Sequence, residues 1–262
     1  MPDLIQTPGP RPRAVPEAMA DRLIVALDLP DPAQARRMVE SLDGVVSFFK
    51  IGLWLLFADG TDRLIGDLIR SGKHVFLDYK MFDIGETVKQ GVARAVERGV
   101  RFVTVHGDPE IMRAAVEGKG ASDFTKIFAI TVLTSLDDAA LREMGYGISV
   151  KQLIRLRVRK AIDCGCDGII ASPDDRPDEI RRMVSNDRLL IATPGVRPAG
   201  ASADDHKRHA TPQDAIANGA DYLVIGRPIV KAVDPVASAR AIIREMEAGE
   251  ARFPSLALVV SG

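Results

Sequence analysis

The stretch that decides the fold covers residues 74–106 and reads HVFLDYKMFDIGETVKQGVARAVERGVRFVTVH. It opens with a nearly continuous apolar run, His74–Lys80, and closes with a second one, Phe102–His106. Runs without polar alternation are typical of parallel strands that are covered on both faces. Between them, Thr87–Arg98 has apolar residues at helical spacing, and Gly99 suits the left-handed residue that often ends a helix. The stretch therefore predicts one strand–helix–strand unit of a parallel sheet.

The same unit repeats outward in both directions. The predicted strands are Leu23–Asp28, Phe48–Gly52, His74–Lys80, Phe102–His106, Ile127–Thr134, Gly168–Pro173, Leu189–Val196 and Tyr222–Pro228. Segments with helical spacing between them include Ala33–Ser41, Asp62–Ser71, Thr87–Arg98 and Pro212–Asn218, and glycines suited to helix ends are Gly44, Gly72, Gly99, Gly165 and Gly219. Eight strands in strict alternation with helices close into a barrel more readily than into an open sheet. We therefore predict a single (β/α)8 TIM barrel.

The barrel is expected to span residues 21–250 of the 262. Residues 1–20 contain five prolines and no apolar core of a signal peptide, so we expect a mobile tail there. Residues 251–262 include a short apolar run, Leu256–Val260, that we expect to pack on the barrel. The longest gap between strands holds a second helical segment, Val150–Asp163, interpreted as an insertion.

The composition is that of an ordinary globular protein, with 46% hydrophobic and 27% charged residues. Lys and Arg total 35 against 36 Asp and Glu, so the chain lacks the positive field that would hold nucleic acid or an anionic membrane. A small-molecule partner is the better expectation. A basic run on the predicted insertion, with Arg155, Arg157, Arg159 and Lys160, has no interleaved aromatic residues and is interpreted as a solvated helix face.

The two cysteines, Cys164 and Cys166, are separated by one residue, which disfavours a disulfide between them. Reduced thiols indicate a cytoplasmic protein. Together with His206 and His209 they could suggest zinc, but their spacing is not that of known zinc sites, and we expect no metal.

Polar residues end most of the apolar runs, and in such barrels the active site lies at the carboxyl ends of the strands. The candidates are Asp28, Lys50, Asp78, Lys80, His106, Thr134 and Arg197. Asp and Lys on neighbouring strands would place four charges in one mouth. For His106, a packed and hydrogen-bonded structural role is the better expectation.

Asp78 and Lys80 share one face of their strand because side chains alternate with period two, and Asp83 follows in the loop. A lysine between carboxylates stays protonated, which suits a proton donor better than a nucleophilic amine. The alternative is a surface ion-pair cluster without catalytic function.

These three residues, spaced Asp-x-Lys-x-x-Asp, closely resemble the signature of the orotidine 5′-monophosphate decarboxylase suprafamily. In that suprafamily the signature also lies on the third strand. The resemblance extends from about Leu23 to Met246 of the sequence. Further segments that carry it are Leu27–Asp28, Lys50–Gly52, Thr131–Ser135, Thr193–Pro198 and Gly226–Pro228.

The suprafamily also contains magnesium-dependent sugar-phosphate enzymes, which resemble one another in having a Glu metal ligand at the end of the second strand. This chain has Lys50 there. Because a protonated lysine cannot bind Mg²⁺, Lys50 argues against the metal-dependent branch. The resemblance then implies cofactor-free decarboxylation of orotidylate to UMP and CO2 in de novo pyrimidine biosynthesis.

The resemblance also implies roles for individual residues. Lys80 would stabilise the carbanion at C6 and deliver a proton to it, and Asp78 would crowd the departing carboxylate and orient Lys80. Lys50 and Asp28 would hold ribose hydroxyls. The other implied substrate contacts are Thr134 at the pyrimidine edge, Thr87, and Asp83 contributed by the partner subunit of a homodimer with shared sites.

Phosphate binding has an independent physical basis, because barrels often bind phosphate in the loops after strands seven and eight. Arg197, Gly226 and Arg227 follow those strands, and the planar guanidinium matches phosphate oxygens in pairs. The family usually has a Gln where this chain has His206, whose second hydrogen-bond donor depends on protonation. We expect His206 to assist phosphate binding in a pH-dependent way.

Two other functions stay open at this point. One is a magnesium-dependent sugar-phosphate lyase on the same scaffold. The other is a catalytically silent barrel that binds nucleotides, against which the presence of Lys80 argues.

Overall fold

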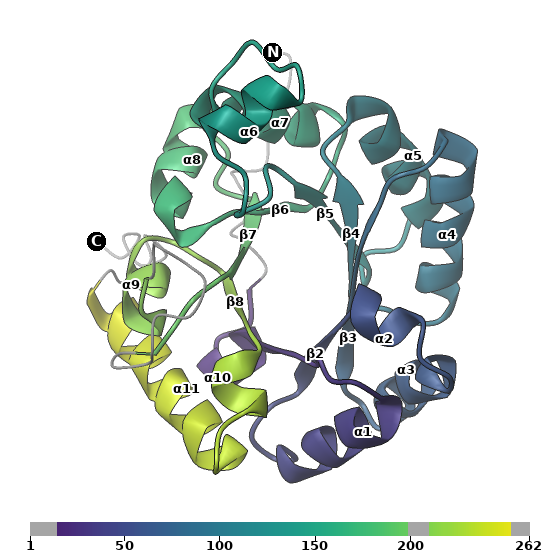
Figure 1. Cartoon of the computed structure of the whole chain (residues 1–262), viewed down its shortest axis with the longest axis vertical. Helices are drawn as coiled ribbons and strands as arrows, with labels where there is room; N and C mark the ends of the chain where they lie inside the picture. Colours follow the sequence, from purple (N-terminus) through teal and green to yellow (C-terminus); the bar gives the residue numbers. More distant parts are fainter. Residues whose placement is uncertain (1–14, 199–209, 253–262) are drawn as a thin grey trace, which may run out of the picture.

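A computed structural model describes residues 15–198 and 210–252 of the chain. In this part of the chain eight parallel strands, each hydrogen-bonded to the next, close into a barrel in sequence order, with β8 paired to β1 (Figure 1). The strands are β1 (Leu23–Ala26), β2 (Phe48–Gly52), β3 (His74–Met81), β4 (Phe102–His106), β5 (Lys126–Ile130), β6 (Gly168–Ile170), β7 (Leu190–Pro194) and β8 (Tyr222–Ile225). The predicted (β/α)8 barrel is confirmed.

Helices surround the strands on the outside (Figure 1). They are α1 (Pro32–Ser41), α2 (Leu53–Leu56), α3 (Thr61–Arg70), α4 (Gly85–Glu97), α5 (Pro109–Lys119), α6 (Asp138–Glu143), α7 (Val150–Asp163), α8 (Pro177–Val184), α9 (Pro212–Ala217), α10 (Arg227–Val230) and α11 (Pro235–Arg252), with short 3₁₀ turns η1 (Met19–Arg22) and η2 (Pro173–Asp175). None of the helices in the described part of the chain is long and apolar enough to cross a membrane.

Several strands end earlier than predicted. β1 stops at Ala26, β5 at Ile130 and β8 at Ile225, and the polar residues Asp28, Thr134 and Arg227 lie beyond these strand ends, in loops or at the start of α10. The predicted tail is also too long: Met19 is buried in the core and Val15 packs against the barrel interior. Residues 1–14 and 253–262, including the apolar run predicted to pack on the barrel, lie outside the described residues.

The barrel interior is built in layers. Phe48, Phe76, Phe102 and Tyr222 are buried inside it, with ring centroids 4.8 Å apart for Phe48 and Phe102 and 5.0 Å apart for Phe102 and Tyr222. By the period of a strand, the residues two positions further along point to the same side. An aromatic layer therefore lies directly beneath the polar side chains of β2, β3 and β4.

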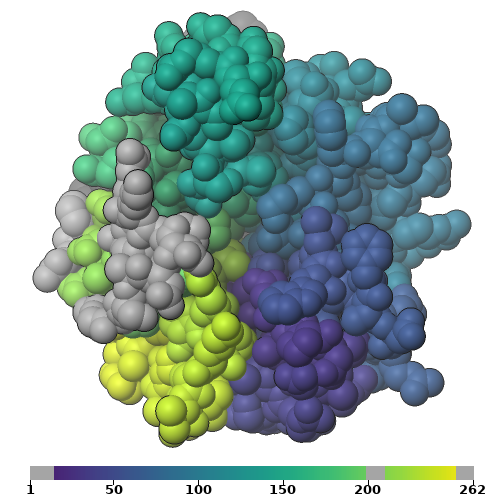
Figure 2. Space-filling model, viewed as in Figure 1, coloured from purple at the N-terminus to yellow at the C-terminus, as the bar shows by residue number. Residues whose placement is uncertain are grey.

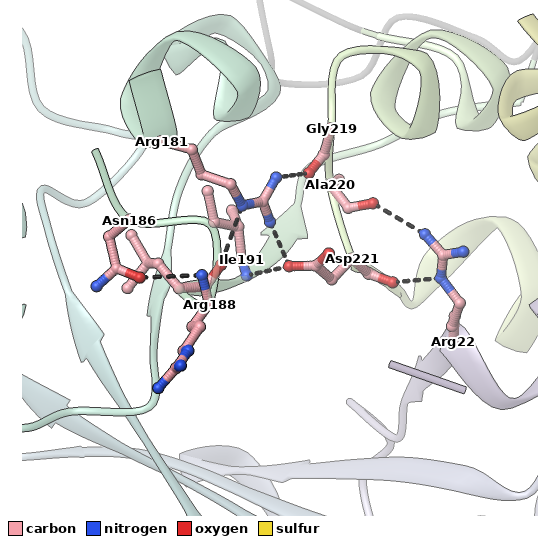
Figure 3. Close-up of polar contacts among 9 residues, drawn as sticks. Arg22, Arg181, Asn186, Arg188, Ile191, Gly219, Ala220 and Asp221 are labelled. Atoms are coloured by element: carbon pink, nitrogen blue, oxygen red, sulfur yellow. Dashed lines mark hydrogen bonds and ion pairs between the residues drawn. The ribbon is translucent and has the colours of Figure 1, made fainter. Parts of the chain in front are cut away.

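The amino ends of the strands hold a group of charged side chains that we call the basal cluster: Arg22, Arg181, Asp221 and Glu250. Figure 3 shows the first three of these residues. Asp221, 1% exposed, pairs with Arg181 and accepts a hydrogen bond from the backbone N–H of Ile191 at 2.8 Å. Arg22 donates to two backbone carbonyls and pairs with Glu250 at 2.8 Å. The cluster ties the ends of β1, β7 and β8 together.

Candidate active site

The carboxyl ends of the strands face the viewer in Figures 1 and 2, where the purple segment after β1 and the blue segment after β2 adjoin the yellow-green segment after β8. Four charged residues meet at this end: Asp28, Lys50, Asp78 and Lys80, here called the mouth cluster. They come from three consecutive strands or the residues just after them, which the parallel register of β1, β2 and β3 brings side by side.

The mouth cluster is a row of alternating charges. Lys50 Nζ lies 3.0 Å from Asp28 Oδ1 and 3.5 Å from Asp78 Oδ2. Lys80 Nζ lies 2.8 Å from the other oxygen of Asp78, Oδ1. Asp78 and Lys80, predicted to lie beside each other at the end of their strand, are in contact.

Exposure differs along the row. Lys50 is buried, with 9% of its side chain exposed, whereas 38% of the Lys80 side chain and 45% of the Asp28 side chain are exposed. Gly52 makes room for the buried end, because a Cβ atom there would lie 3.0 Å from Lys50 Nζ. Lys50 is thus fixed by the fold, and Lys80 faces the solvent side of the mouth.

The Asp78 carboxylate is ionised in this setting. Burial by itself would raise its pKa, but the charges of Lys50 and Lys80 and hydrogen bonds from Lys80 and Thr104 outweigh that effect, and the pKa lies below its ordinary value. The site therefore holds a largely buried, ionised carboxylate between two lysine side chains.

Thr104 is a member of the site that the sequence interpretation missed. This fully buried residue of β4 donates a hydrogen bond to Asp78 Oδ1 at 3.0 Å and accepts one from the backbone N–H of Lys80, also at 3.0 Å. One signal was present in the sequence: Thr104 is a polar residue two positions after Phe102, so strand alternation puts it on the interior side.

Asp83 and Thr87 do not join the row within their own chain. Both are exposed, and Asp83 accepts a hydrogen bond from the backbone N–H of Ile84 at 2.7 Å. In the described part of the chain Asp83 forms no ion pair. Thr134, after β5, is also exposed. Their predicted contacts with substrate stay predictions.

The residues predicted to bind phosphate lie after β7 and β8, as expected. Arg197 is partly buried, and its backbone N–H donates to the carbonyl of Ala210 at 3.1 Å. Arg227 begins α10, and the preceding Gly226 lies beside β1, since a Cβ atom there would be 3.2 Å from the Cβ of Ala26 and 3.8 Å from Asp28 Oδ2. This end of the mouth is therefore adjacent to the mouth cluster. His206 lies outside the described residues.

His106 packs as predicted but is not fully hydrogen-bonded. Its ring lies 4.4 Å from that of Phe82, and its Nδ1 is buried with no hydrogen-bond partner among the described residues. Burial and the nearby charge of Arg157 hold the pKa of His106 below its ordinary value. The imidazole is therefore neutral at pH 7.

The cysteines lie away from this site, at the turn between α7 and β6. Cys164 ends α7, and both thiols are free. Burial raises the pKa of Cys166 to about 12, so its thiol stays protonated.

Comparison with known proteins identifies relatives over nearly the whole barrel. The model of the orotidine 5′-phosphate decarboxylase / HUMPS family matches residues 21–242. The chain is 49% identical over 231 residues to an orotidine 5′-phosphate decarboxylase from Rhodopseudomonas palustris, covering 88% of this chain and 97% of that protein. It is 48% identical over 229 residues to one from Caulobacter vibrioides, covering 86% and 97%.

A solved structure agrees with these relatives. The orotidine 5′-phosphate decarboxylase of Lactobacillus acidophilus superimposes with a TM-score of 0.76 at 32% identity, covering 87% of this chain and all of that one. The chain belongs to the orotidine 5′-phosphate decarboxylase / HUMPS family.

Proposed function

We propose that this protein is a carboxy-lyase that converts orotidine 5′-monophosphate to UMP and CO2. The observation that carries the proposal is the alternating row of charges, in which Asp78 holds the partly exposed ammonium of Lys80 at 2.8 Å, in a chain of this family. The reaction belongs to de novo pyrimidine biosynthesis. We place it in the cytoplasm, a compartment that suits two free cysteines.

The chemistry follows from the charges. When the bond between C6 and the carboxylate breaks, the electron pair stays on C6 and CO2 leaves. The resulting carbanion lies in the plane of the ring, so a nearby positive charge must stabilise it. Lys80 supplies that charge and then transfers a proton from Nζ to C6, forming the new C–H bond. Asp78 orients Lys80, and its own negative charge lies beside the carboxylate that leaves.

The remainder of the substrate is held along the same end of the barrel. Asp28 and Lys50, already paired at 3.0 Å, have the hydrogen-bonding groups to hold ribose hydroxyls. Arg227 and Arg197 bind the phosphate, with His206 as a pH-dependent third contact. Thr134 contacts the pyrimidine. Phosphate binding far from C6 supplies binding energy that orients the ring.

The active site is shared between two copies of the chain. Asp83 is exposed and lies between two apolar side chains, Phe82 and Ile84, that are 68% and 72% exposed. After the neighbouring strand, Trp54 on α2 and Phe57 directly after this helix are 62% and 86% exposed. A group of large, exposed apolar side chains such as these marks an interface. A two-fold dimer through this surface would bring Asp83 and Thr87 to the mouth cluster of the partner subunit.

The first test is to follow the absorbance of orotidylate with purified protein, with and without EDTA. We expect rapid loss of orotidylate that EDTA leaves unchanged. Absence of turnover would refute the proposal, and turnover that EDTA abolishes would favour a metal-dependent reaction.

The shared site has its own test, which mixes Lys80→Ala and Asp83→Ala chains that are each inactive as homodimers. If Asp83 acts in the partner's site, one site of each heterodimer carries both defects and the other carries none. Activity should then return to about half of the wild-type value per heterodimer. A mixture that forms heterodimers but stays inactive would show that Asp83 acts within its own chain.

A further inference from the structure

The β3–β4 pairing is interrupted beside the mouth cluster. Leu77 lies opposite Val103 and Met81 lies opposite Val105, so three residues of β3 face the single residue Thr104 of β4. Extra residues in one strand form a bulge, and bulges beside active sites redirect side chains. The three residues opposite Thr104 are residues 78–80, which include both members of the closest ion pair in the mouth.

The bulge forces an uncommon backbone conformation on Lys80, whose φ angle is +49°. A non-glycine residue pays a cost in this left-handed region, and the conformation persists only where neighbouring groups hold it. Here the backbone N–H of Lys80 donates to the hydroxyl of Thr104 at 3.0 Å, where the pairing of β3 with β4 is interrupted. Thr104 therefore supplies a hydrogen-bond acceptor to the backbone of Lys80 at the bulge.

The same hydroxyl also fixes the carboxylate. A hydroxyl has one proton, and the oxygen of Thr104 already accepts from the backbone of Lys80, so its proton is directed to Asp78 Oδ1, 3.0 Å away. Lys80 Nζ donates to this same oxygen at 2.8 Å. Thr104 is fully buried, so its hydroxyl does not exchange these partners for bulk water.

We propose that Thr104 is a positioning residue that clamps the β3 bulge and thereby aims the Asp78 carboxylate and the Lys80 ammonium at the reacting carbon. The inference rests on the proposed decarboxylase function. Lysine side chains have many rotamers, and the other partner of Asp78, Lys50, lies at 3.5 Å. Thr104 is the short, rigid, uncharged contact that joins the backbone of one member of the pair to the carboxylate of the other.

The test compares Thr104→Val, which keeps the shape and removes the hydroxyl, with Thr104→Ser, which keeps the hydroxyl. The matched control is Thr193→Val on β7, where the threonine is equally buried but its hydroxyl has no hydrogen-bond partner among the described residues. Each variant is assayed for kcat and KM with orotidylate, for UMP binding by calorimetry and for its melting temperature.

We expect Thr104→Val to lower kcat by about tenfold to a hundredfold, the range for a misplaced catalytic group, while KM and UMP affinity change by less than about threefold. Thr104→Ser should recover most of kcat, and Thr193→Val should resemble the wild type. If Thr104→Val does not fold, Thr104→Ala, which cannot overpack the site, should show the same selective loss of kcat.

Two results would overturn the inference while leaving the proposed function intact. One is wild-type kcat in Thr104→Val. The other is a parallel loss of kcat, UMP affinity and melting temperature that Thr104→Ser does not restore, since that pattern marks a purely structural residue. A wild-type protein that does not decarboxylate orotidylate would overturn the function and the inference together.

Discussion

The mouth cluster and the basal cluster use similar residue types at opposite ends of one barrel, yet their hydrogen bonds go to different places. In the basal cluster, Arg22 and Arg181 donate to backbone carbonyls as well as to carboxylates. In the mouth cluster, the described partners of Lys50 and Lys80 side chains are carboxylates alone. The basal cluster therefore connects neighbouring strands, whereas the lysines of the mouth cluster pair with the carboxylates of the same cluster.

The difference shows what an ion pair can be used for. A guanidinium keeps its charge and binds several acceptors in fixed geometry, which suits a structural tie. An ammonium has three rotatable donors and can give up a proton, and Lys80 keeps 38% of its side chain exposed. The mouth cluster, whose positive charges are lysines, is therefore the cluster that can do proton chemistry.

The largest effect is expected from removing the ammonium at the mouth. Lys80→Ala should lower kcat by at least about a thousandfold, because it removes both the proton donor and the charge beside the carbanion. The melting temperature should change little, since Lys80 is not part of the core. The control is Lys119→Ala, which breaks an equally short 2.8 Å ion pair with Asp167 away from the mouth and should retain wild-type kcat. Substantial turnover by Lys80→Ala would show that Lys80 is not the proton donor.

The same substitution at an aspartate of each cluster should separate stability from activity. Asp221→Asn leaves Arg181 without its buried counter-charge and should lower the free energy of unfolding by about 3 kcal/mol, with kcat unchanged. Asp78→Asn should lower kcat strongly and affect stability less, because Lys80, the closest ion-pair partner of Asp78, keeps 38% of its side chain exposed. Denaturant titration and steady-state kinetics on both variants measure this. Equal losses of activity in both variants would contradict the assignment of the basal cluster to stability and of the mouth cluster to activity.

Replacing an arginine at the mouth end of the barrel should weaken substrate binding and leave the fold intact. Arg227→Ala should raise KM for orotidylate by about tenfold to a hundredfold through the loss of charge-assisted hydrogen bonds to phosphate. Activity on orotidine, which lacks the phosphate, should stay nearly unchanged. Arg240→Ala, an exposed arginine on α11, serves as the control. A similar loss on both substrates would show that Arg227 does not bind the phosphate.

Sequence reasoning works well for this protein where a local pattern decides the structure. β2 and β4 have the predicted bounds, because a buried parallel strand reads as an apolar run. The row from Asp28 to Lys80 follows from placing polar residues at strand ends. Strand ends such as that of β1 are predicted less well, since the same polar residue can close a strand or begin a loop.

What sequence reasoning misses depends on contacts between distant residues. Arg181 and Asp221 are 40 residues apart and match no motif, so their pairing emerges only when β7 and β8 lie side by side. The bulge is similar: Asp78 and Lys80 are in contact, as predicted, but strand alternation does not reveal that Thr104 lies opposite three residues of β3. A register shift is a property of two strands, and one strand's sequence does not encode it.

The smallest expected effect concerns two histidines, one at each end of the barrel. His74 begins β3 at the basal end and His106 ends β4 at the mouth, and burial holds the pKa of each below the ordinary value of 6.5, with a further lowering by Arg101 and Arg157 respectively. A histidine with a lowered pKa binds its proton more readily in the unfolded chain. Stability from these groups is therefore fully present above about pH 6.5 and is lost as the pH falls toward their folded-state values.

We accordingly expect the free energy of unfolding to decline between pH 7 and pH 5, and each of His74→Phe and His106→Phe to make that decline shallower. Phenylalanine preserves the ring contacts, with Phe48 for His74 and with Phe82 for His106, and removes the titration. Denaturant titrations at several pH values, compared with the wild type, isolate each contribution from other titrating groups. If both variants flatten the profile alike, acid sensitivity arises from burial at either end of the barrel and not from the chemistry of the mouth. A profile flattened by His106→Phe alone would instead tie the acid sensitivity to the mouth.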